Sequence, residues 1–339
     1  MGFETYLEKN KDFADFLNQV SNNTGKRNME TWKKNLKENS ELFKQTGWAC
    51  PQLQDKERGK TAIIMGASPS IEKQIQCLKE IQQDPDFVLC GLSSNLEFLL
   101  KNGIKPKYIV TVDADPTQGE FFDNINMDET KDIVLITNTF SYPPMLKKWR
   151  GPLYFLALDT ADKWIEKKQK KWYPDINGNG QPFPTLMGQF NTITVFSFLV
   201  LGCSIILFVG NEMSFRDDKI RYYVDRDDPR DREPRGLHGD IYGKIVYTTS
   251  GLLALKLCLE HILELLSGAG WFFNCSEAGI FGVTKRFPNL RVPWIKQLTL
   301  KNGIAQARHI MRTGEPFYEY HQGSYLQVPD MKSRVSLMR

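Results

Sequence analysis

The sequence predicts an α/β fold: a Rossmann-like, mainly parallel sheet flanked by helices, with an N-terminal helical extension. The first observation behind this prediction is a series of short apolar runs, each of which stops at a glycine, an aspartate or an asparagine. The second is that helical patterns lie between several of these runs, as the crossovers of a parallel sheet require. The third is a proline-free stretch, residues 3–46, in which apolar residues recur at helical spacing.

The proline-free stretch predicts two helices. Phe13 and Leu17 lie on the apolar face of the first, and Leu36 lies on that of the second. The segment between them, 22–25, reads Asn-Asn-Thr-Gly, and because these residues weaken a helix we expect a break there. Residues 50–60 contain a proline and many charges, which indicates a linker into the core.

The predicted core is a series of seven strands with helices between them. The strands are 61–65 before Gly66, 87–90 before Gly91, 108–112 before Asp113, 133–137 before Asn138, 154–158 before Asp159, 205–209 before Gly210 and 271–273 before Asn274. The helices are 71–81, 95–101, 192–201, 250–266 and 304–312. Ligands of parallel sheets bind at the carboxyl ends of the strands, so the polar residues that end these runs are the candidate site.

These elements divide the chain into three parts. We place a helical extension and linker at 1–54, a Rossmann-like core at 55–290 and a C-terminal helical tail at 291–339. Within the core, residues 216–240 are dense in both charge signs and contain prolines. Such a segment cannot form a core, so it predicts a charged lid loop over the strand ends.

The run 193–209 is almost wholly apolar and approaches the length that spans a bilayer. A membrane span is one interpretation. Gly202, Cys203 and Ser204 interrupt the run, however, where a helix would end. A buried helix followed by a central strand explains the same residues, and we therefore expect no membrane span.

The composition narrows the partners and the compartment. The net charge of +4 is small for 339 residues, so we expect no nucleic-acid partner. The six cysteines include no CxxC pair, which indicates reduced thiols rather than disulfides or a zinc site. The first residues lack the pattern of a signal peptide. A cytoplasmic location is the expectation.

The segment Gly66-Ala67-Ser68-Pro69-Ser70 follows a strand and opens a helix. Its backbone N–H groups and the hydroxyls of Ser68 and Ser70 would face an anion, and glycine permits a close approach of the backbone. The segment is neither a Walker loop nor the GxGxxG fingerprint. Phosphate binding is one interpretation, and an ordinary turn with a serine cap is the other.

Two aspartates end the third strand. The alternation of a strand puts Asp113 and Asp115 on one face, where they could share a divalent cation with a phosphate or bind a ribose. The alternative is a solvated strand end with a turn before the following proline. Asn138 and Asp159, at the next two strand ends, would reach the same crevice or serve only their turns.

Five further residues complete the candidate site. Asn191 and Thr192 precede the apolar helix and would contact an anion or a sugar, unless they only cap that helix. Glu212 is a candidate general base or hydroxyl ligand. His238 is the histidine whose loop context suits acid–base chemistry. Asn274 ends the last strand in the same style, whereas Cys275 has no sequence neighbour that would activate a nucleophile.

With these residues in view, the chain resembles the MptE-like family, named for the archaeal 6-hydroxymethylpterin diphosphokinase. That family also includes the motility-associated-factor proteins implicated in glycosylating flagellin. The resemblance covers about 55–290. It rests on 62–70, on 102–106 leading into Asp113, on 202–212 and on 274–279.

Bacterial sialyltransferases that use a CMP-activated sugar contain similar elements: a G-N-G-P-S loop, a helix that starts with small residues, and a strand ending Gly-x-Asp. Here Glu212 replaces that aspartate, and Ala67-Ser68 departs from the usual loop. Those enzymes use a histidine that aligns roughly with 244–247, where this chain has none. By the resemblance, His238 is a displaced candidate for it.

The resemblance implies a transferase that binds a nucleotide-activated small-molecule donor. The first hypothesis is a glycosyltransferase using a CMP-linked, nonulosonic-acid-like nucleotide sugar, which needs no cofactor. The second is a 6-hydroxymethylpterin diphosphokinase-like enzyme that uses ATP and Mg²⁺, with Asp113 and Asp115 as metal ligands. The third is a non-catalytic nucleotide-binding module. The acceptor, whether glycan, protein or small alcohol, and the oligomeric state stay open.

Overall fold

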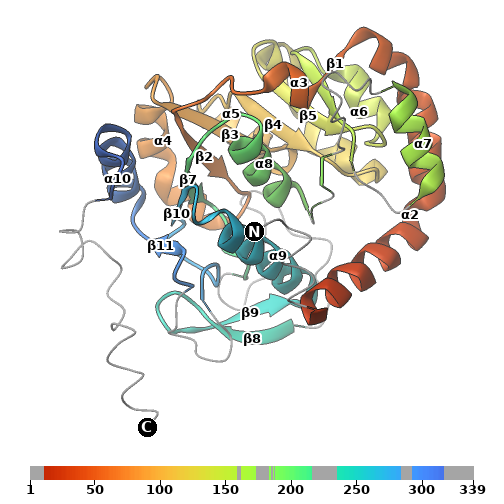
Figure 1. Cartoon of the computed structure of the whole chain (residues 1–339). Coiled ribbons are helices and arrows are strands. Elements are labelled where there is room, and N and C mark those ends of the chain that lie inside the picture. The colour runs from red at the N-terminus through yellow and green to blue at the C-terminus, as the bar shows by residue number, and fades with distance from the viewer. Residues whose placement is uncertain are drawn as a thin grey trace.

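The computed structural model describes residues 11–158, 162–172, 183–184, 186, 188–215, 235–283 and 292–316. Within these residues the centre of the molecule is a nine-stranded sheet, and all of its pairings are parallel (Figure 1). In spatial order its strands are β1 (Gly47–Trp48), β6 (Leu153–Leu156), β5 (Val134–Asn138), β4 (Tyr108–Thr111), β3 (Phe87–Leu92), β2 (Thr61–Met65), β7 (Ile205–Val209), β10 (Trp271–Asn274) and β11 (Ile295–Gln297). The seven predicted strands are confirmed, and two short strands at the edges were not predicted.

Helices cover both faces of this sheet (Figure 1). The α-helices are α2 (Lys11–Gln45), α3 (Ala49–Leu53), α4 (Ile75–Ile81), α5 (Ser93–Lys101), α6 (Pro143–Lys148), α7 (Lys163–Trp172), α8 (Gly188–Leu199), α9 (Ser250–Leu266) and α10 (Leu300–Thr313). Three 3₁₀ segments, η1 (Pro69–Gln74), η2 (Pro116–Phe122) and η3 (Met127–Thr130), follow strands β2 and β4.

Strand β2 shows why the strands read as continuous apolar runs. Its five residues are all buried. Ala62 and Ile64 point to a core shared with α2, α8 and α9, whereas Ile63 and Met65 point to a second core shared with α4 and α10. A parallel sheet with helices on both faces buries both sides of each central strand, so neither side needs polar residues.

The order of the strands places a switch point between β2 and β7. The chain moves outward from β2 through β3, β4 and β5 to β6, and then returns to β7 on the other side of β2. The strand order therefore reverses at the carboxyl ends of β2 and β7, which is where open α/β sheets bind ligands.

Two expectations for the connecting segments need correction. The predicted break at 22–25 is wrong, because α2 is one continuous helix from Lys11 to Gln45. Without a proline, the unfavourable residues cost only helix propensity, about 0.5–1 kcal/mol each, and do not forbid the helix. Residues 235–239, expected within the charged lid loop, form strand β8 (Arg235–Gly239), which pairs antiparallel with β9 (Ile245–Thr249). The remainder of that loop, 216–234, lies outside the described residues.

The apolar run 193–209 divides as expected into the end of α8 and strand β7. Gly202, with φ of 83°, lies in the turn between them. Among the described residues, no helix combines the length and the apolar content that crossing a bilayer requires.

Helix α2 is fastened across the carboxyl ends of β4 and β5. Asn35 Nδ2 donates to the carbonyl oxygens of Ala114 and Phe140, at 3.0 and 3.1 Å. One turn later, Asn39 Nδ2 donates to Thr139 O and Ser141 O, at 3.1 and 2.9 Å. Residues 30–45 of the predicted extension are therefore packed onto the sheet, although the boundary at 54 stays a prediction.

We expect Asn39→Ala to lower the free energy of unfolding by about 2 kcal/mol, because two buried carbonyls lose this donor. Urea denaturation followed by circular dichroism measures the change. Ser40→Ala on the same helix is the control, since its hydroxyl bonds only to Lys37 O at the surface. Equal losses of unfolding free energy in the two variants would show that the hydrogen bonds from Asn39 do not stabilise the fold.

Candidate functional site

Two glycines bring the ends of β2 and β7 into direct contact. A Cβ atom on Gly66 would lie 2.2 Å from Gly210 O, and one on Gly210 would lie 2.7 Å from Gly66 O. Gly210 also has φ of 62°, a left-handed conformation that glycine adopts at low cost. Close packing of the two strand ends therefore explains both glycines without a ligand.

The predicted anion loop is bonded to the end of β7. Ser68 N donates to Gly210 O at 3.0 Å, and Ser70 N donates to Glu212 Oε1 at 2.5 Å. In return, Glu212 N lies 3.4 Å from Ser68 Oγ. The N–H groups of Ser68 and Ser70 thus have protein acceptors, and a carboxylate of the chain occupies the place expected for an anion. The binding role of Gly66, Ala67, Ser68 and Ser70 stays a prediction.

Three buried polar atoms near the switch point have no hydrogen-bond partner among the described residues. They are Ser70 Oγ after β2, Asn211 Nδ2 after β7 and Asn191 Oδ1 in the first turn of α8. Their residues are at most 3% exposed. Buried polar atoms in folded proteins are almost always bonded to protein, water or a ligand. These three are the polar atoms near the switch point whose hydrogen bonds the described residues leave unmade.

The first turn of α8 borders the same place. Phe190 lies beside β2, with its Cε2 atom 3.2 Å from the position that a Gly66 Cβ would take. Asn191 Nδ2 donates to Leu255 O at 3.1 Å, and Thr192 Oγ1 donates to Gly188 O at 2.9 Å. Thr192 thus makes a helix-internal bond, whereas Asn191 retains its acceptor oxygen for a ligand.

The end of β10 is tied to β7 by a polar network. Asn211 N donates to Ser276 Oγ at 3.0 Å, and Ser276 N donates to Asn274 Oδ1 at 3.1 Å. Asn274 Nδ2 donates to Phe281 O and to Gln297 Oε1. Both polar groups of Asn274 are therefore engaged, so it shapes the edge of the site. Its Nδ2 group has no further hydrogen to donate, and its predicted ligand contact stays a prediction.

The backbone is strained next to this network. Three described residues other than glycine have a positive φ: Asp55 lies elsewhere, before β2, whereas Met213 and Glu277 lie here, with φ of 53° and 55°. They follow β7 and β10 respectively, close to Glu212 and Ser276. Side chains larger than glycine pay an energetic cost in this conformation, and such residues cluster at functional sites.

Asp113, Asp115 and Asn138 lie at the same edge but farther along it. With neighbouring strands about 4.8 Å apart, β4 and β5 are roughly 10 and 14 Å from β2. Asp113 Oδ1 accepts from Asp115 N at 3.2 Å, and Asp115 Oδ1 accepts from Thr117 N at 2.9 Å, which caps η2. The turn expected as the alternative to a metal site is thus present, and both aspartates are exposed.

Asn138 is fully buried and has partners at both ends of its amide. Its Nδ2 donates to Val112 O at 2.6 Å, and its Oδ1 accepts from Phe140 N and Ser141 Oγ. The bonds give Asn138 a structural role between β4 and β5, and its ligand contact stays a prediction. Asp159 lies outside the described residues.

His238 lies on the hairpin β8–β9, which covers the ends of β7 and β10. Thr248 Oγ1 donates to Met213 O at 2.9 Å, and Ile241 N donates to Gly279 O at 2.9 Å. The imidazole is 3% exposed, and its Nδ1 lies 2.7 Å from the carbonyl oxygen of the next residue. The hairpin therefore holds a buried imidazole beside the segments that follow β7 and β10, and the catalytic role of His238 stays a prediction.

The thiol of Cys275, next to Asn274, is fully buried. Burial, with the nearby Glu277 carboxylate, raises the pKa of this thiol well above its ordinary value. The thiolate form that nucleophilic attack needs is correspondingly rare near neutral pH.

Sequence reasoning missed several polar residues of this edge. Asn95 donates to Met65 O and Gly66 O and accepts from Leu92 N, so it holds the end of β2 against α5. Gln189 accepts from Ser93 Oγ and donates to Gln118 Oε1. The signal was present, because the polar triplet 93–95 directly follows a strand. The predicted strand stopped at residue 90 and the predicted helix began at 95, so Ser93 and Ser94, which open α5, fell between the two elements.

Comparison with known proteins agrees with this geometry. The model of the family described as "6-hydroxymethylpterin diphosphokinase MptE-like" matches residues 30–218. No curated protein matches the chain. Among solved structures, that of a MAf glycosyltransferase from Magnetospirillum magneticum AMB-1 is similar, with a TM-score of 0.53 and 16% identity.

That likeness covers 78% of this chain and 39% of the MAf protein, so the chain spans well under half of its length. At this identity, the likeness shows the fold. The family match is stronger evidence, because it covers more than half of the chain and includes the end of α2, the strands β2–β7 and Glu212. The chain belongs to the 6-hydroxymethylpterin diphosphokinase MptE-like family.

Proposed function

We propose that the chain is a transferase that binds a nucleotide-activated donor at the switch point between β2 and β7. The observation that carries this proposal is the pair of buried, unsatisfied polar atoms there, Ser70 Oγ and Asn211 Nδ2. A hydroxyl and an amide both donate hydrogen bonds to phosphate or sugar oxygens. The family membership and the likeness to a MAf glycosyltransferase support a transferase over a module that only binds nucleotides.

The reaction that fits these donors best is glycosyl transfer from a CMP-linked, nonulosonic-acid-like sugar. An acceptor hydroxyl attacks the anomeric carbon, the bond from that carbon to the phosphate oxygen breaks, and nucleoside monophosphate leaves with the electron pair. Hydroxyl and amide donors stabilise the charge that develops on the leaving phosphate. His238 is the proposed acceptor of the attacking hydroxyl's proton.

The second candidate is ATP-dependent diphosphoryl transfer, which the family's name favours. It calls for Mg²⁺ to neutralise the polyphosphate. Asp113 and Asp115 are exposed near this edge, and Mg²⁺ needs only one or two carboxylates when phosphates supply other ligands. Among the described residues, no group of three or more acidic, histidine or cysteine side chains is placed to hold a metal. The two aspartates thus fit a metal that a bound polyphosphate helps to hold, and they stay the predicted ligands.

A thermal-shift panel with CMP, UDP, GDP and ATP, each with and without Mg²⁺, tests the proposal. At a concentration 100 times Kd, CMP should raise Tm by about 5 °C without metal. A shift with ATP only in the presence of Mg²⁺, accompanied by release of AMP, would establish the diphosphokinase instead. If a nucleotide binds but no acceptor is turned over, the chain is the non-catalytic nucleotide-binding module of the third hypothesis.

Ser70→Ala should separate binding from stability. We expect the unfolding free energy to stay within about 0.5 kcal/mol of wild type, because the removed hydroxyl has no bond to lose, while the shift with CMP disappears. Ser267→Ala, at the exposed end of α9, is the matched control and should keep the shift. A destabilised Ser70→Ala protein that still binds CMP normally would make this hydroxyl structural.

A further inference from the structure

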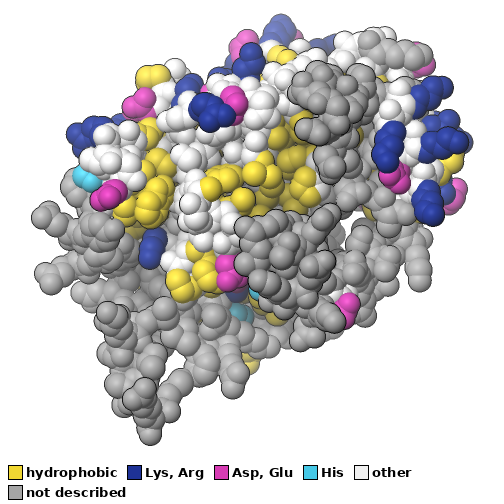
Figure 2. Space-filling view, in the orientation of Figure 1, with side chains coloured by type: hydrophobic (Ala, Val, Ile, Leu, Met, Phe, Trp, Pro, Cys, Tyr) yellow, Lys and Arg dark blue, Asp and Glu magenta, His cyan; other side chains and the backbone are white. Residues whose placement is uncertain are grey.

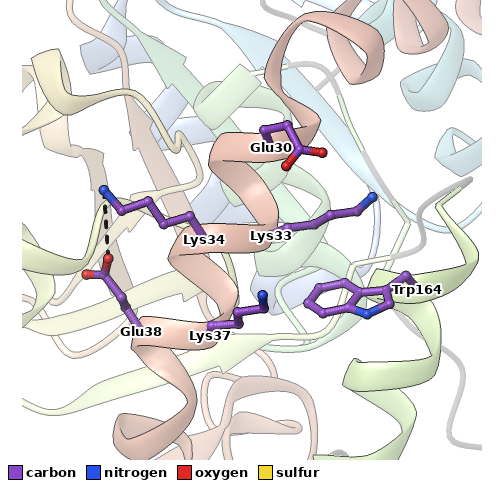
Figure 3. Close-up of a pocket in the computed structure, with 6 residues that line it drawn as sticks. All are labelled: Glu30, Lys33, Lys34, Lys37, Glu38 and Trp164. Carbon is purple, nitrogen blue, oxygen red and sulfur yellow. Dashed lines mark ion pairs between the residues drawn. The ribbon is translucent and has the colours of Figure 1, made fainter.

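A groove with a different chemistry lies between helices α2 and α7. Its volume is about 460 Å³, and it is lined by Glu30, Lys33, Lys34, Lys37, Glu38 and Trp164 (Figure 3). Helix α7 leads away from β6, which is four strands from β2 in the sheet. The groove is therefore separate from the switch point and from the proposed donor.

Lysines crowd around the indole of Trp164. Lys33, Lys37 and Lys168 place their Nζ atoms 6.0, 5.7 and 5.6 Å from the centre of its ring. Lys33 also lies 3.4 Å from Asp162 Oδ2. Lys37 and Lys168, in contrast, form no ion pair with any described residue. Figure 2 shows Lys and Arg side chains gathered over α7, so this edge of the molecule attracts anions.

Both helices that form the groove are held rigidly. Asn35 and Asn39 fix α2 to the loops after β4 and β5. Gln169 fixes α7, because it accepts from Thr139 Oγ1 and from Leu158 N and donates to Leu158 O. Asp162 caps α7 by accepting from Trp164 N and Ile165 N, both at 2.9 Å. A groove with fixed walls loses little conformational entropy when a ligand binds.

The mixture of side chains in the groove restricts the class of ligand. The three lysines and two glutamates of the lining leave one net positive charge at neutral pH. Glu38 pairs with Lys34 at 4.0 Å, and Glu30 would repel nucleic acid, which carries a charge on each phosphate (Figure 3). A flat membrane surface would not enter a concave groove. A monoanion that carries hydroxyl groups suits this lining, because carboxylates accept hydrogen bonds from hydroxyls and ammonium groups donate to them.

The indole of Trp164 adds an apolar surface, which favours a sugar ring over other hydroxylated monoanions. Its partly exposed face can pack against the C–H groups on one side of a sugar ring, while the surrounding ammonium groups pair with a carboxylate on the ring's edge. We propose that the groove between α2 and α7 is an accessory binding site for a sugar residue that bears one carboxylate. This inference does not rest on the reaction proposed at the switch point.

Saturation-transfer NMR with the methyl glycoside of N-acetylneuraminic acid tests the site in the full chain, with CMP added to occupy the switch point. Wild type should transfer saturation to the sugar, and the signal should fall as salt is raised because the charges are exposed. The methyl ester of the same glycoside, which has no charge, should bind about tenfold more weakly. Equal binding of ester and acid would overturn the proposal, and so would no transfer from the acid.

Three variants locate the binding. Trp164→Ala should weaken the affinity about tenfold and Lys37→Glu about fivefold, whereas Lys301→Glu, at an exposed position of α10, should leave it unchanged. Lys37 is exposed, so the Lys37→Glu protein remains informative if Trp164→Ala unfolds. Sugar binding to wild type that is seen without CMP and abolished by CMP would place the sugar at the switch point instead. Stronger binding of a hexaglutamate peptide, lost in Lys37→Glu, would assign the groove to an acidic polypeptide. Either result would overturn the proposal.

Discussion

Replacing Glu57 by alanine is expected to lower the free energy of unfolding by about 3 kcal/mol, the largest stability effect that the structure predicts. The carboxylate is 1% exposed and lies at the amino end of the sheet. It accepts from Tyr108 OH at 2.7 Å and pairs with Lys107 and Lys60, at 2.6 and 3.0 Å. The alanine variant leaves the buried hydroxyl of Tyr108 without its acceptor and removes the counter-charge of two lysines.

The same network predicts how stability depends on pH. Burial raises the pKa of Glu57, but the hydrogen bonds from Lys107, Tyr108 and Lys60 outweigh burial and hold this pKa below its ordinary value of 4.5. The contribution of Glu57 to stability is therefore complete above the pKa that it has in the unfolded chain. It is lost as the pH falls through the lower pKa that it has in the folded protein. The difference in unfolding free energy between wild type and Glu57→Gln should shrink below about pH 4.5.

Urea denaturation across this pH range measures both effects. Asp132→Ala is the control, because its pair with Lys105 is exposed at both ends and should contribute less than about 1 kcal/mol. If Glu57→Ala lowers the free energy of unfolding no more than Asp132→Ala does, the buried network makes no net contribution to stability. If the difference in unfolding free energy between wild type and Glu57→Gln grows as the pH falls, folding raises the pKa of Glu57 instead of lowering it.

The sheet could be predicted from the sequence because burial on both faces leaves a plain signal. Each central strand is a short apolar run that ends at a polar or small residue, and β2 and β7 were predicted to the residue. Elements whose stability comes from tertiary packing were missed. Strand β1 has two residues and depends on its pairing with β6, and the hairpin β8–β9 follows a charged segment that hides it.

The places of the polar residues in the fold were predicted, but their hydrogen bonds were not. The sequence placed these residues at the carboxyl ends of the strands, but it did not reveal which of them are satisfied by neighbours distant in sequence. Asn138 and Asn274 are engaged by bonds that span up to 26 residues, and Ser70 N is bonded to a residue 142 positions away. In contrast, Asn211 was passed over although its Nδ2 is among the unsatisfied atoms.

Glu212 shows why this difference matters for function. Its residue type and position suggested a general base, yet its Oε1 accepts from Ser70 N at 2.5 Å and the residue is 3% exposed. Its backbone is also fixed, because Ile280 N donates to Glu212 O at 2.8 Å. A donor phosphate that approaches Ser70 therefore meets a carboxylate already in place, and the two negative charges repel each other.

We accordingly expect Glu212→Gln to bind CMP about tenfold more tightly than wild type, since removing one like charge beside the phosphate is worth on the order of 1–2 kcal/mol. The glutamine oxygen still accepts from Ser70 N, so stability should change by less than about 1 kcal/mol, whereas Glu212→Ala leaves that amide without an acceptor and should cost about 2 kcal/mol. Isothermal titration with CMP, alongside thermal melts of the three proteins, gives both quantities. Unchanged CMP affinity in Glu212→Gln, together with a loss of turnover of about 100-fold or more, would instead identify the carboxylate as the base of the reaction.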